Sequence, residues 1–269
     1  MSTISPLAYV HLNANIGNNV TVDPFAVINE EVTVGDGTHI MSHAVIMNGS
    51  NIGKSCAIYP GAVIGAIPQD LKFVGEKTTV EIGDNTTIRE CVTVNRGTKE
   101  KWKTVVGSNC LLMAYVHIAH DCIIGDHVIL ANTVQLAGHV EVGNYAILGG
   151  LSAAQQFIRI GAHTYIAGNS VIRKDIPPYV KSAREPMGFM GINIVGLSRS
   201  NFSKERIKVI SDIYHTLFVE KNTTSAALEK IEKTFPASAE RDSILQFVRS
   251  SKSGIIKRSS KINDEDNPF

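Results

Sequence analysis

The residues best suited to chemistry are three histidines and a glycine whose positions are related by one spacing. His120 and Gly138 are 18 residues apart, His139 follows Gly138, and His117 lies three residues before His120. A histidine titrates near neutral pH and therefore suits general-base catalysis. The backbone N–H of a nearby glycine can stabilise a developing oxyanion. Together, a base and an oxyanion donor suit direct attack of a substrate hydroxyl on an acyl group that is already activated.

Other reaction classes have less support from the side chains. The sequence shows no Ser-His-Asp arrangement, and the repeat described below places the thiols of Cys110 and Cys122 inside the fold. A lone histidine in a solenoid is usually only a surface residue. Here three histidines are expected to converge with Gln156 on one outer edge, beside Asp121 and pointing outward, which favours a functional site.

A six-residue repeat sets the elements that position these side chains. Every sixth residue is Ile, Leu or Val from Ile4 to Ile64, from Ile82 to Val94 and from Val106 to Ile172, except for Ala154. A second slot, four residues later, is mostly small or β-branched. Residues two apart on a strand share a face, so both slots point inward. A hexapeptide period is typical of a parallel β-helix, and three sides of six residues give a coil of 18 residues.

The corners of this coil need a backbone that turns sharply. Pairs such as Asn18-Asn19, Asp36-Gly37 and Asp84-Asn85 occupy them. Gly, Asn and Asp tolerate the left-handed conformation of tight corners. We therefore predict a β-helix domain over residues 1–185.

Two segments interrupt the register, Ala66–Val80 and Gly97–Val105. The first carries Asp70 and Lys72 beside Phe73. Loops that leave a regular solenoid are often functional or form interfaces. The alternative is that both are tolerated insertions.

The repeat stops at Pro177-Pro178, and the apolar period then becomes helical. We expect one helix to start at Ser203–Arg206 and others to span Ala226–Phe235 and Ala239–Ser250. This predicts a small α-helical domain over residues 186–269. The segment Arg173–Lys208 holds eight basic and three acidic residues, which indicates either a solvated surface or a dock for an acidic partner.

The composition excludes several classes of protein. The 269 residues carry a net charge of +1, so no bulk attraction to nucleic acid or membranes is expected. No apolar run reaches membrane length, and the first ten residues do not resemble a secretory signal. Four cysteines without a CxxC pair indicate a reduced, cytoplasmic protein.

Several runs resemble the UDP-N-acetylglucosamine O-acyltransferases of lipid A biosynthesis over nearly the whole chain. These runs are Gln69–Lys72, His117–Cys122, Leu136–Val140, Asp175–Val180 and Gly191–Ile194. The resemblance implies a left-handed β-helix, which is an exception to the usual right-handed crossover. It implies transfer of a 3-hydroxyacyl chain from acyl carrier protein to the glucosamine 3-hydroxyl of UDP-N-acetylglucosamine. It also implies a homotrimer with sites between neighbouring prisms, a basic docking surface for the carrier protein, and no cofactor or metal.

The resemblance also assigns roles to individual residues. The general base, its orienting carboxylate and the oxyanion amide match His120, Asp121 and Gly138. Sugar or acyl contacts match Asp70, Lys72, His139 and Gln156, and nucleotide or phosphate contacts match His117, Asn193 and Arg199. The chain departs from the family pattern at Gln155, Val195 and Ser200, where a His, an acidic residue and a second Arg are common.

A column of small residues predicts the length of the acyl chain. Ala114, Asn132, Gly150 and Gly168 repeat at the spacing of the coil. In the resembling family the position of Gly168 limits acyl length, so a glycine there predicts a long chain. The alternative is that Gly168 only eases a corner turn.

Three other functions stay open at this point. A related N-acyltransferase of UDP-amino sugars usually carries an N-terminal uridine-binding domain, whereas here the repeat begins at Ile4. A γ-class carbonic anhydrase would bind zinc through histidines such as His117 and His139, but the separation of His117 and His120 does not fit that family. A non-catalytic scaffold would give no reason for the histidines to cluster.

Overall fold

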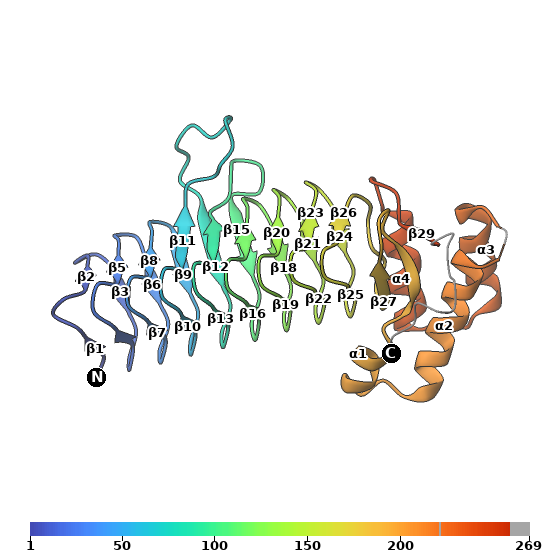
Figure 1. Cartoon of the computed structure of the whole chain (residues 1–269), viewed down its shortest axis with the longest axis horizontal. Coiled ribbons are helices and arrows are strands. Elements are labelled where there is room, and N and C mark those ends of the chain that lie inside the picture. Colours follow the sequence, from blue (N-terminus) through green and yellow to red (C-terminus); the bar gives the residue numbers. More distant parts are fainter. Residues whose placement is uncertain (221, 259–269) are drawn as a thin grey trace.

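The computed structural model describes residues 1–220 and 222–258 and forms a long three-sided prism with helices at its C-terminal end (Figure 1). Each face of the prism is a parallel sheet of short strands, and neighbouring strands come from successive coils. Ile118, for example, pairs with Leu136 of the next coil. The β-helix predicted from the repeat is confirmed, because strands β1 to β26 contain the leading residues of the hexads in order.

The three faces are named sheets A, B and C in chain order. Within the prism, sheet A contains β1 (Thr3–Ile4), β4 (Thr21–Val22), β7 (His39–Ile40), β10 (Ala57–Ile58), β13 (Thr87–Ile88), β16 (Leu111–Leu112), β19 (Ile129–Leu130), β22 (Ile147–Leu148) and β25 (Tyr165–Ile166). Sheet B contains β2 (Tyr9–Val10), β5 (Val27–Ile28), β8 (Val45–Ile46), β11 (Val63–Ala66), β14 (Thr93–Asn95), β17 (His117–Ile118), β20 (Gln135–Leu136), β23 (Ala153–Ala154) and β26 (Val171–Ile172). Sheet C contains β3 (Asn15–Ile16), β6 (Thr33–Val34), β9 (Ser50–Ile52), β12 (Thr79–Ile82), β15 (Lys103–Val106), β18 (Ile123–Ile124), β21 (Glu141–Val142) and β24 (Arg159–Ile160).

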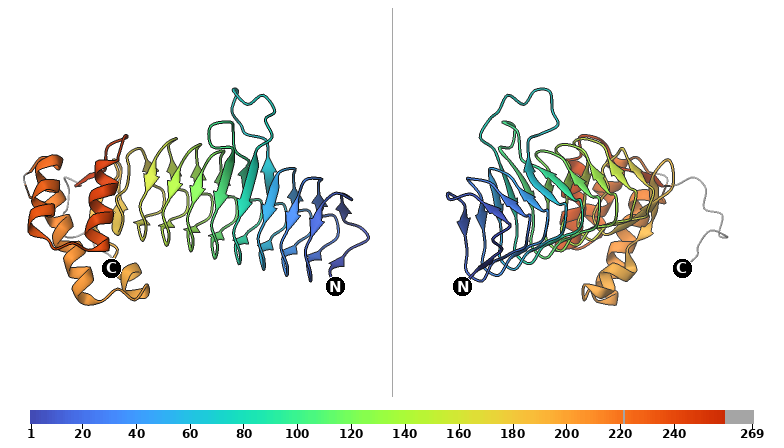
Figure 2. Two further views of the ribbon diagram at one scale, coloured as in Figure 1. Left: turned by 180° about the vertical axis from the view of Figure 1, so that it is seen from behind. Right: turned by 60° about the vertical axis from the view of Figure 1, so that its left-hand side comes forward.

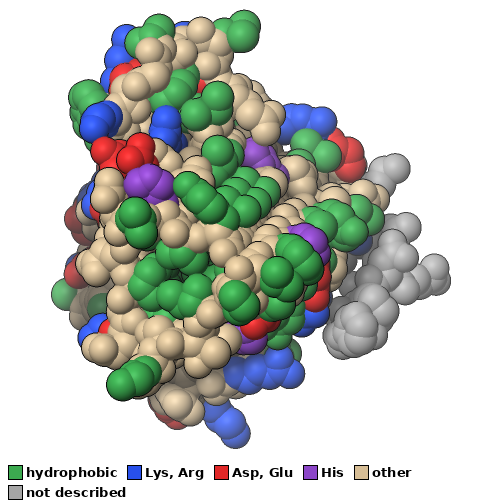
Figure 3. All heavy atoms as spheres, turned by 90° about the vertical axis from the view of Figure 1, so that its left-hand side faces the viewer, with side chains coloured by type: hydrophobic (Ala, Val, Ile, Leu, Met, Phe, Trp, Pro, Cys, Tyr) green, Lys and Arg blue, Asp and Glu red, His purple; other side chains and the backbone are tan. Residues whose placement is uncertain are grey.

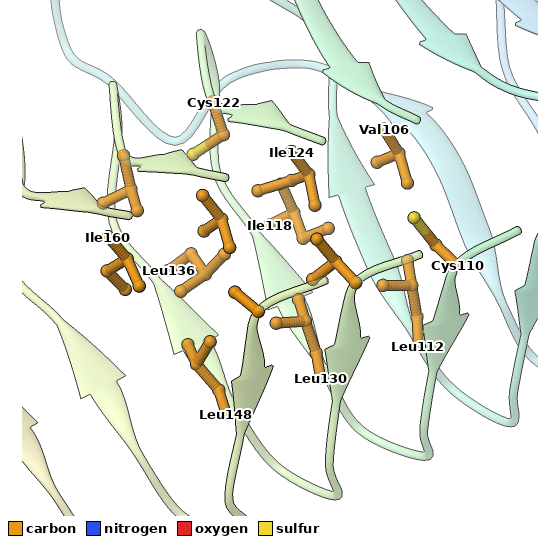
Figure 4. Packing of buried hydrophobic residues seen from close by; sticks show 14 of the residues in the cluster. Val106, Cys110, Leu112, Ile118, Cys122, Ile124, Leu130, Leu136, Leu148 and Ile160 are labelled. Carbon is orange, nitrogen blue, oxygen red and sulfur yellow. The ribbon is translucent and has the colours of Figure 1, made fainter. Parts of the chain in front are cut away.

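Aliphatic side chains from all three faces fill the interior of the prism (Figure 4). Cys110 and Cys122 lie among them, as the repeat predicts, and both are buried. Burial raises the pKa of the Cys122 thiol to about 12. This thiol is therefore protonated at neutral pH and is not available as a nucleophile.

Many corners hold residues bulkier than Gly, Asn or Asp. Phe25, Tyr115 and Leu151 all have positive φ values, as do many other corner residues that are not Asn, Asp or Gly. One compensation is stacking between coils, since the Tyr145 ring lies 4.5 Å from the His127 ring and 4.8 Å from the His163 ring. Side-chain packing along an edge thus offsets part of the cost of a left-handed residue.

Both interruptions of the repeat are loops that leave the same corner of the prism. Residues 67–78 connect β11 to β12, and residues 96–102 connect β14 to β15, so both pass from sheet B to sheet C. They protrude side by side from the prism (Figures 1 and 2). We call this corner the B–C edge, and name the other two the C–A and A–B edges.

The C-terminal part begins as a continuation of sheet A. Strand β27 (Val180–Ala183) pairs with β25, β28 (Gly188–Ile192) pairs antiparallel with β27, and β29 (Lys257–Arg258) pairs with β28. This hairpin was not predicted. The predicted domain boundary at residue 185 falls in its turn and stays a prediction, and residues 259–269 lie outside the described residues.

Four helices follow the hairpin. They are α1 (Ile194–Arg199), α2 (Lys204–Phe218), α3 (Thr224–Thr234) and α4 (Ala239–Arg249). The predicted starts of α2 and α4 are confirmed, because Ser203 and Ser238 cap them. The predicted helix over Ala226–Phe235 is confirmed as α3, which begins two residues earlier, at Thr224, because Thr223 caps it. The short helix α1 was missed.

The N-terminal end of the prism is open. Hydrophobic side chains gather on this end (Figure 3), where the first coil leaves Ile4 and Leu7 exposed.

No helix in the described part of the chain is long and apolar enough to cross a membrane.

Candidate active site

His120 lies on the B–C edge, directly after β17. Its Nδ1 atom lies 2.9 Å from Asp121 Oδ2. The repeat predicts a cluster that points outward from an open edge, but only 6 % of His120 is exposed. The expectation of an open edge is therefore wrong, because the loop of residues 96–102 folds over this corner and its residues bond to Asp121.

Asp121 is fully buried and both of its oxygens accept hydrogen bonds. The Thr98 hydroxyl donates to Oδ2 at 2.6 Å, and the backbone N–H groups of Thr98 and Lys101 donate to Oδ1 at 2.9 and 3.3 Å. Burial by itself would raise the pKa of the Asp121 carboxyl, but hydrogen bonds from Thr98 and His120 outweigh it and the pKa is lowered. An ionised carboxylate only accepts hydrogen bonds, so the His120 proton resides on Nδ1 and Nε2 carries the free lone pair.

Asp70 and Gly138 lie close to His120 Nε2. The nearest carboxylate is that of Asp70, whose Oδ2 lies 4.0 Å away and comes from the loop 67–78. Gly138 lies against the imidazole, and a Cβ atom at this position would be 2.6 Å from His120 Cε1. The Gly138 N–H makes no hydrogen bond among the described residues, so it is free to donate to a ligand.

The other two histidines of the cluster are held beside this pair. His139 is 6 % exposed, its ring lies edge-on to the His120 ring at 5.2 Å, and its Nε2 lies 3.5 Å from Glu100 Oε2. His117 Nδ1 lies 2.7 Å from Thr93 Oγ1. Burial lowers the pKa of both His117 and His139, which favours neutral rings at pH 7.

His120, Asp121 and His139 are close enough together to hold a metal ion. One ligand atom from each of His120, Asp121 and His139 lies within 4.8 Å of the others. Both Asp121 oxygens, however, already accept protein donors, and the Nδ1 proton of His120 is one of them. The donor set is therefore better described as a hydrogen-bonded network than as a vacant ligand set.

Two predicted contacts lie at the surface of the B–C edge. Gln156 is exposed, two coils beyond His120, and Lys72 is exposed in the loop 67–78. The structure places Asp70, His117 and His139 near His120. Lys72 and Gln156 share the B–C edge with them, and their contact with a substrate stays a prediction.

Asn193 and Arg199 are not in that group. They line a cavity of about 580 Å³ over sheet A and the C–A edge, together with the departures Val195 and Ser200. The Asn193 amide is already engaged, since Oδ1 accepts the Gly196 N–H that caps α1 and Nδ2 donates to the His163 carbonyl at 2.9 Å.

Gly168 lies on the third corner, the A–B edge. Its φ lies outside the left-handed region, and a Cβ atom there would be 3.0 Å from the Gly150 carbonyl oxygen. The equivalent positions one and two coils before Gly150 hold Asn132 and Ala114. The corner turn therefore does not require a glycine at Gly168, which weakens the purely structural alternative.

Thr98 and Glu100 lie at the site but were not predicted from the sequence. The interruption Gly97–Val105 was noted as a possible functional loop, but no residue in it was singled out. Thr98 contacts Asp121 across 23 positions of sequence, and no periodic signal links the two.

Two family models match the chain. One is described as the second domain of UDP-N-acetylglucosamine O-acyltransferase and matches residues 175–256. The other is described as the bacterial transferase hexapeptide and matches residues 13–48 and 103–138.

Curated relatives match almost from end to end. The acyl-(acyl-carrier-protein)–UDP-N-acetylglucosamine O-acyltransferase of Chlorobaculum parvum is 51 % identical over 94 % of this chain and 97 % of its own length. The protein of the same name from Sulfurihydrogenibium is 48 % identical over 99 % of this chain and 100 % of its own length.

Solved structures agree in fold. The UDP-N-acetylglucosamine acyltransferase of Bacteroides fragilis is 49 % identical and covers 94 % of this chain and 99 % of its own, with a TM-score of 0.93. The Acinetobacter baumannii protein is 38 % identical and covers 95 % and 100 %, with a TM-score of 0.92. The expected left-handed β-helix with a helical C-terminal part is thereby confirmed. At this identity over nearly the full length of both chains, the chain belongs to the UDP-N-acetylglucosamine O-acyltransferase family.

Proposed function

We propose that this protein transfers a 3-hydroxyacyl group from acyl carrier protein to the glucosamine 3-hydroxyl of UDP-N-acetylglucosamine, the first step of lipid A biosynthesis. The observation that carries the mechanism is the buried His120–Asp121 pair. It leaves Nε2 unprotonated beside the free N–H of Gly138. These two groups supply what attack of an alcohol on a thioester requires.

The reaction proceeds by direct attack. His120 Nε2 takes the proton as the sugar oxygen bonds to the thioester carbon, and the Gly138 N–H donates to the oxyanion that forms. The intermediate then collapses, the C–S bond breaks, and the imidazolium returns its proton to the departing thiolate. Asp121 stabilises the imidazolium in between. General-base catalysis contributes about 10²–10⁴ in rate, and one oxyanion donor contributes about 10²–10³.

The remaining contacts are assigned to the two substrates. Asp70, Lys72, His139 and Gln156 contact the sugar or the acyl group, and His117, Asn193 and Arg199 contact the nucleotide. Support is strongest for Asp70, which faces His120 Nε2. It is weakest for Asn193, because both ends of its amide are engaged within the chain.

The positions of these groups support a homotrimer, which the family resemblance implies. His120 is on the B–C edge, Arg199 is beside the C–A edge and Gly168 is on the A–B edge. One prism cannot present three edges to one substrate, whereas neighbouring prisms can bring different edges together. Sedimentation at micromolar concentration should give a trimer, and a monomer alone would contradict the proposal.

The acyl carrier protein is proposed to dock on the basic segment Arg173–Lys208. Part of its excess charge is neutralised within the chain, because Arg206 pairs with Glu240 and Lys208 with Asp212. Lys181 and Lys204 make no ion pair among the described residues and are available to an acidic partner. We place the enzyme in the cytoplasm, in keeping with its four free cysteines.

Product analysis tests this function. Purified protein is incubated with UDP-N-acetylglucosamine and a ladder of acyl carrier protein thioesters, with His120→Ala as the control. The sugar nucleotide should gain the mass of one 3-hydroxyacyl group in a linkage that mild base cleaves, as expected of an ester. A base-stable amide product would instead support the N-acyltransferase, and no product would contradict acyl transfer.

A further inference from the structure

The loop 96–102 makes its most deeply buried contact through Thr98. This residue is 6 % exposed and is bonded to both oxygens of Asp121. Its hydroxyl bond to Oδ2 is 2.6 Å long, which is typical of a hydroxyl that donates to a charged acceptor. The same oxygen accepts the His120 Nδ1 proton.

This arrangement fixes the plane of the carboxylate. Donors on both oxygens prevent rotation about the side-chain bond of Asp121, so Oδ2 stays 2.9 Å from His120 Nδ1. A carboxylate that rotated away would release the imidazole to the other tautomer, with its proton on the nitrogen that must act as base. The tautomer of His120 therefore depends on a group outside the His120–Asp121 pair.

We propose that Thr98 is a positioning residue for acyl transfer, which holds Asp121 so that His120 keeps its proton on Nδ1 and presents a free Nε2. This inference rests on the proposed role of His120 as general base. It gives the loop 96–102 a specific purpose beyond covering the site.

The loop has its own anchors, so its shape does not depend on the Thr98 hydroxyl alone. The Gly97 N–H donates to the Thr79 carbonyl at 3.1 Å, and the Trp102 N–H donates to the Thr98 carbonyl at 2.7 Å. The Lys101 ammonium pairs with Glu141 at 3.1 Å. Removing the hydroxyl also removes the acceptor of the Glu100 N–H at 3.2 Å, but the other anchors should keep the loop in place. The carboxylate would keep its backbone donors on Oδ1 and lose the Thr98 donor on Oδ2, so Oδ2 would be held less firmly against His120 Nδ1.

Three variants separate positioning from packing. Thr98→Val keeps the shape of the side chain but lacks the donor, and Thr98→Ser keeps the donor. The matched control is Thr86→Val, because Thr86 is also buried and its hydroxyl donates to the Gly107 carbonyl at 2.8 Å, away from the site.

Thr98→Val should lower kcat by roughly 10- to 100-fold, which is what one hydrogen bond to a charged group supports. KM should change little, and Thr98→Ser should remain near the wild type. Because the lost donor helps to lower the pKa of Asp121, the pKa of this carboxyl should rise in Thr98→Val. Thr86→Val should lower thermal stability and leave kcat unchanged.

A second measurement needs no substrate. In ¹⁵N-histidine-labelled protein, NMR reports which ring nitrogen of His120 carries the proton, with His120→Ala used to assign its signals. Thr98→Val should show loss of the pure Nδ1–H tautomer, and Thr98→Ser should retain it. An unchanged tautomer in Thr98→Val, or equal losses of kcat in the Val and Ser variants, would overturn the proposal. If the wild type shows the Nδ1–H tautomer but no acyl transfer, the proposed function fails and the tautomer comparison still decides the role of Thr98.

Discussion

Gly138→Ala adds a single methyl group and replaces no reacting side chain, yet we expect it to lower the activity. An added Cβ would lie 2.6 Å from His120 Cε1 and 2.7 Å from Nε2, whereas ordinary contacts begin at 3.4 Å. The imidazole must therefore retreat by about 0.8 Å. A displacement near 1 Å costs on the order of 10²-fold in rate when reacting groups must align. We expect kcat to fall by about that factor.

The fold should tolerate this substitution. The φ of Gly138 lies outside the left-handed region, and the equivalent positions of neighbouring coils carry the side chains of His120 and Gln156. Steady-state kinetics give the loss in kcat, and thermal unfolding gives the effect on stability. Gly150→Ala, the same change at the equivalent position of the A–B edge, is the stability control. If Gly138→Ala kept the wild-type kcat, the contact would not set the position of His120 and the reasoning would be refuted.

Three further predictions concern activity and stability. His120→Ala should abolish turnover, with a loss in rate of at least about 10²–10⁴. The circular dichroism spectrum should stay unchanged, because the ring lies outside the prism core. A variant that kept a tenth of the wild-type rate would contradict the role of His120 as general base. Gly168→Met should shift the preferred acyl chain to a shorter one with little change in stability, since each methylene excluded from a groove forfeits about 0.8 kcal/mol of burial; an unmoved chain-length profile would rule this out. Burial lowers the pKa of His117, His139 and His163, so the unfolded state binds more protons once the pH falls below the ordinary histidine value of about 6.5. The free energy of unfolding should therefore decline between about pH 7 and pH 5. Urea titrations at one protein concentration would show this decline, and a flat profile would speak against it.

The sequence by itself determined the prism. The inward slots depend only on the alternation of side chains along a strand and on stacking of one coil upon the next, so residues such as Ile118 and Leu136 reveal their partners by spacing. Helix starts were equally local, because Ser203 and Ser238 cap α2 and α4 within their own first turns. The nearness of His120 to Gly138 followed from the same register, whereas the pairing of His120 with Asp121 was implied by the family resemblance.

The tertiary structure decided how the site is closed and held. The loop 96–102 has no repeat to fix its path, so nothing in the spacing indicated that Thr98 would reach Asp121 or that His120 would be buried. The engagement of Asn193 with His163 was also invisible, because it depends on how α1 folds against the C–A edge. In periodic elements the repeat spacing identifies which residues stack on each other. Loops and termini are positioned instead by contacts between residues far apart in sequence. The base and its carboxylate could therefore be predicted, but the group that orients them could not.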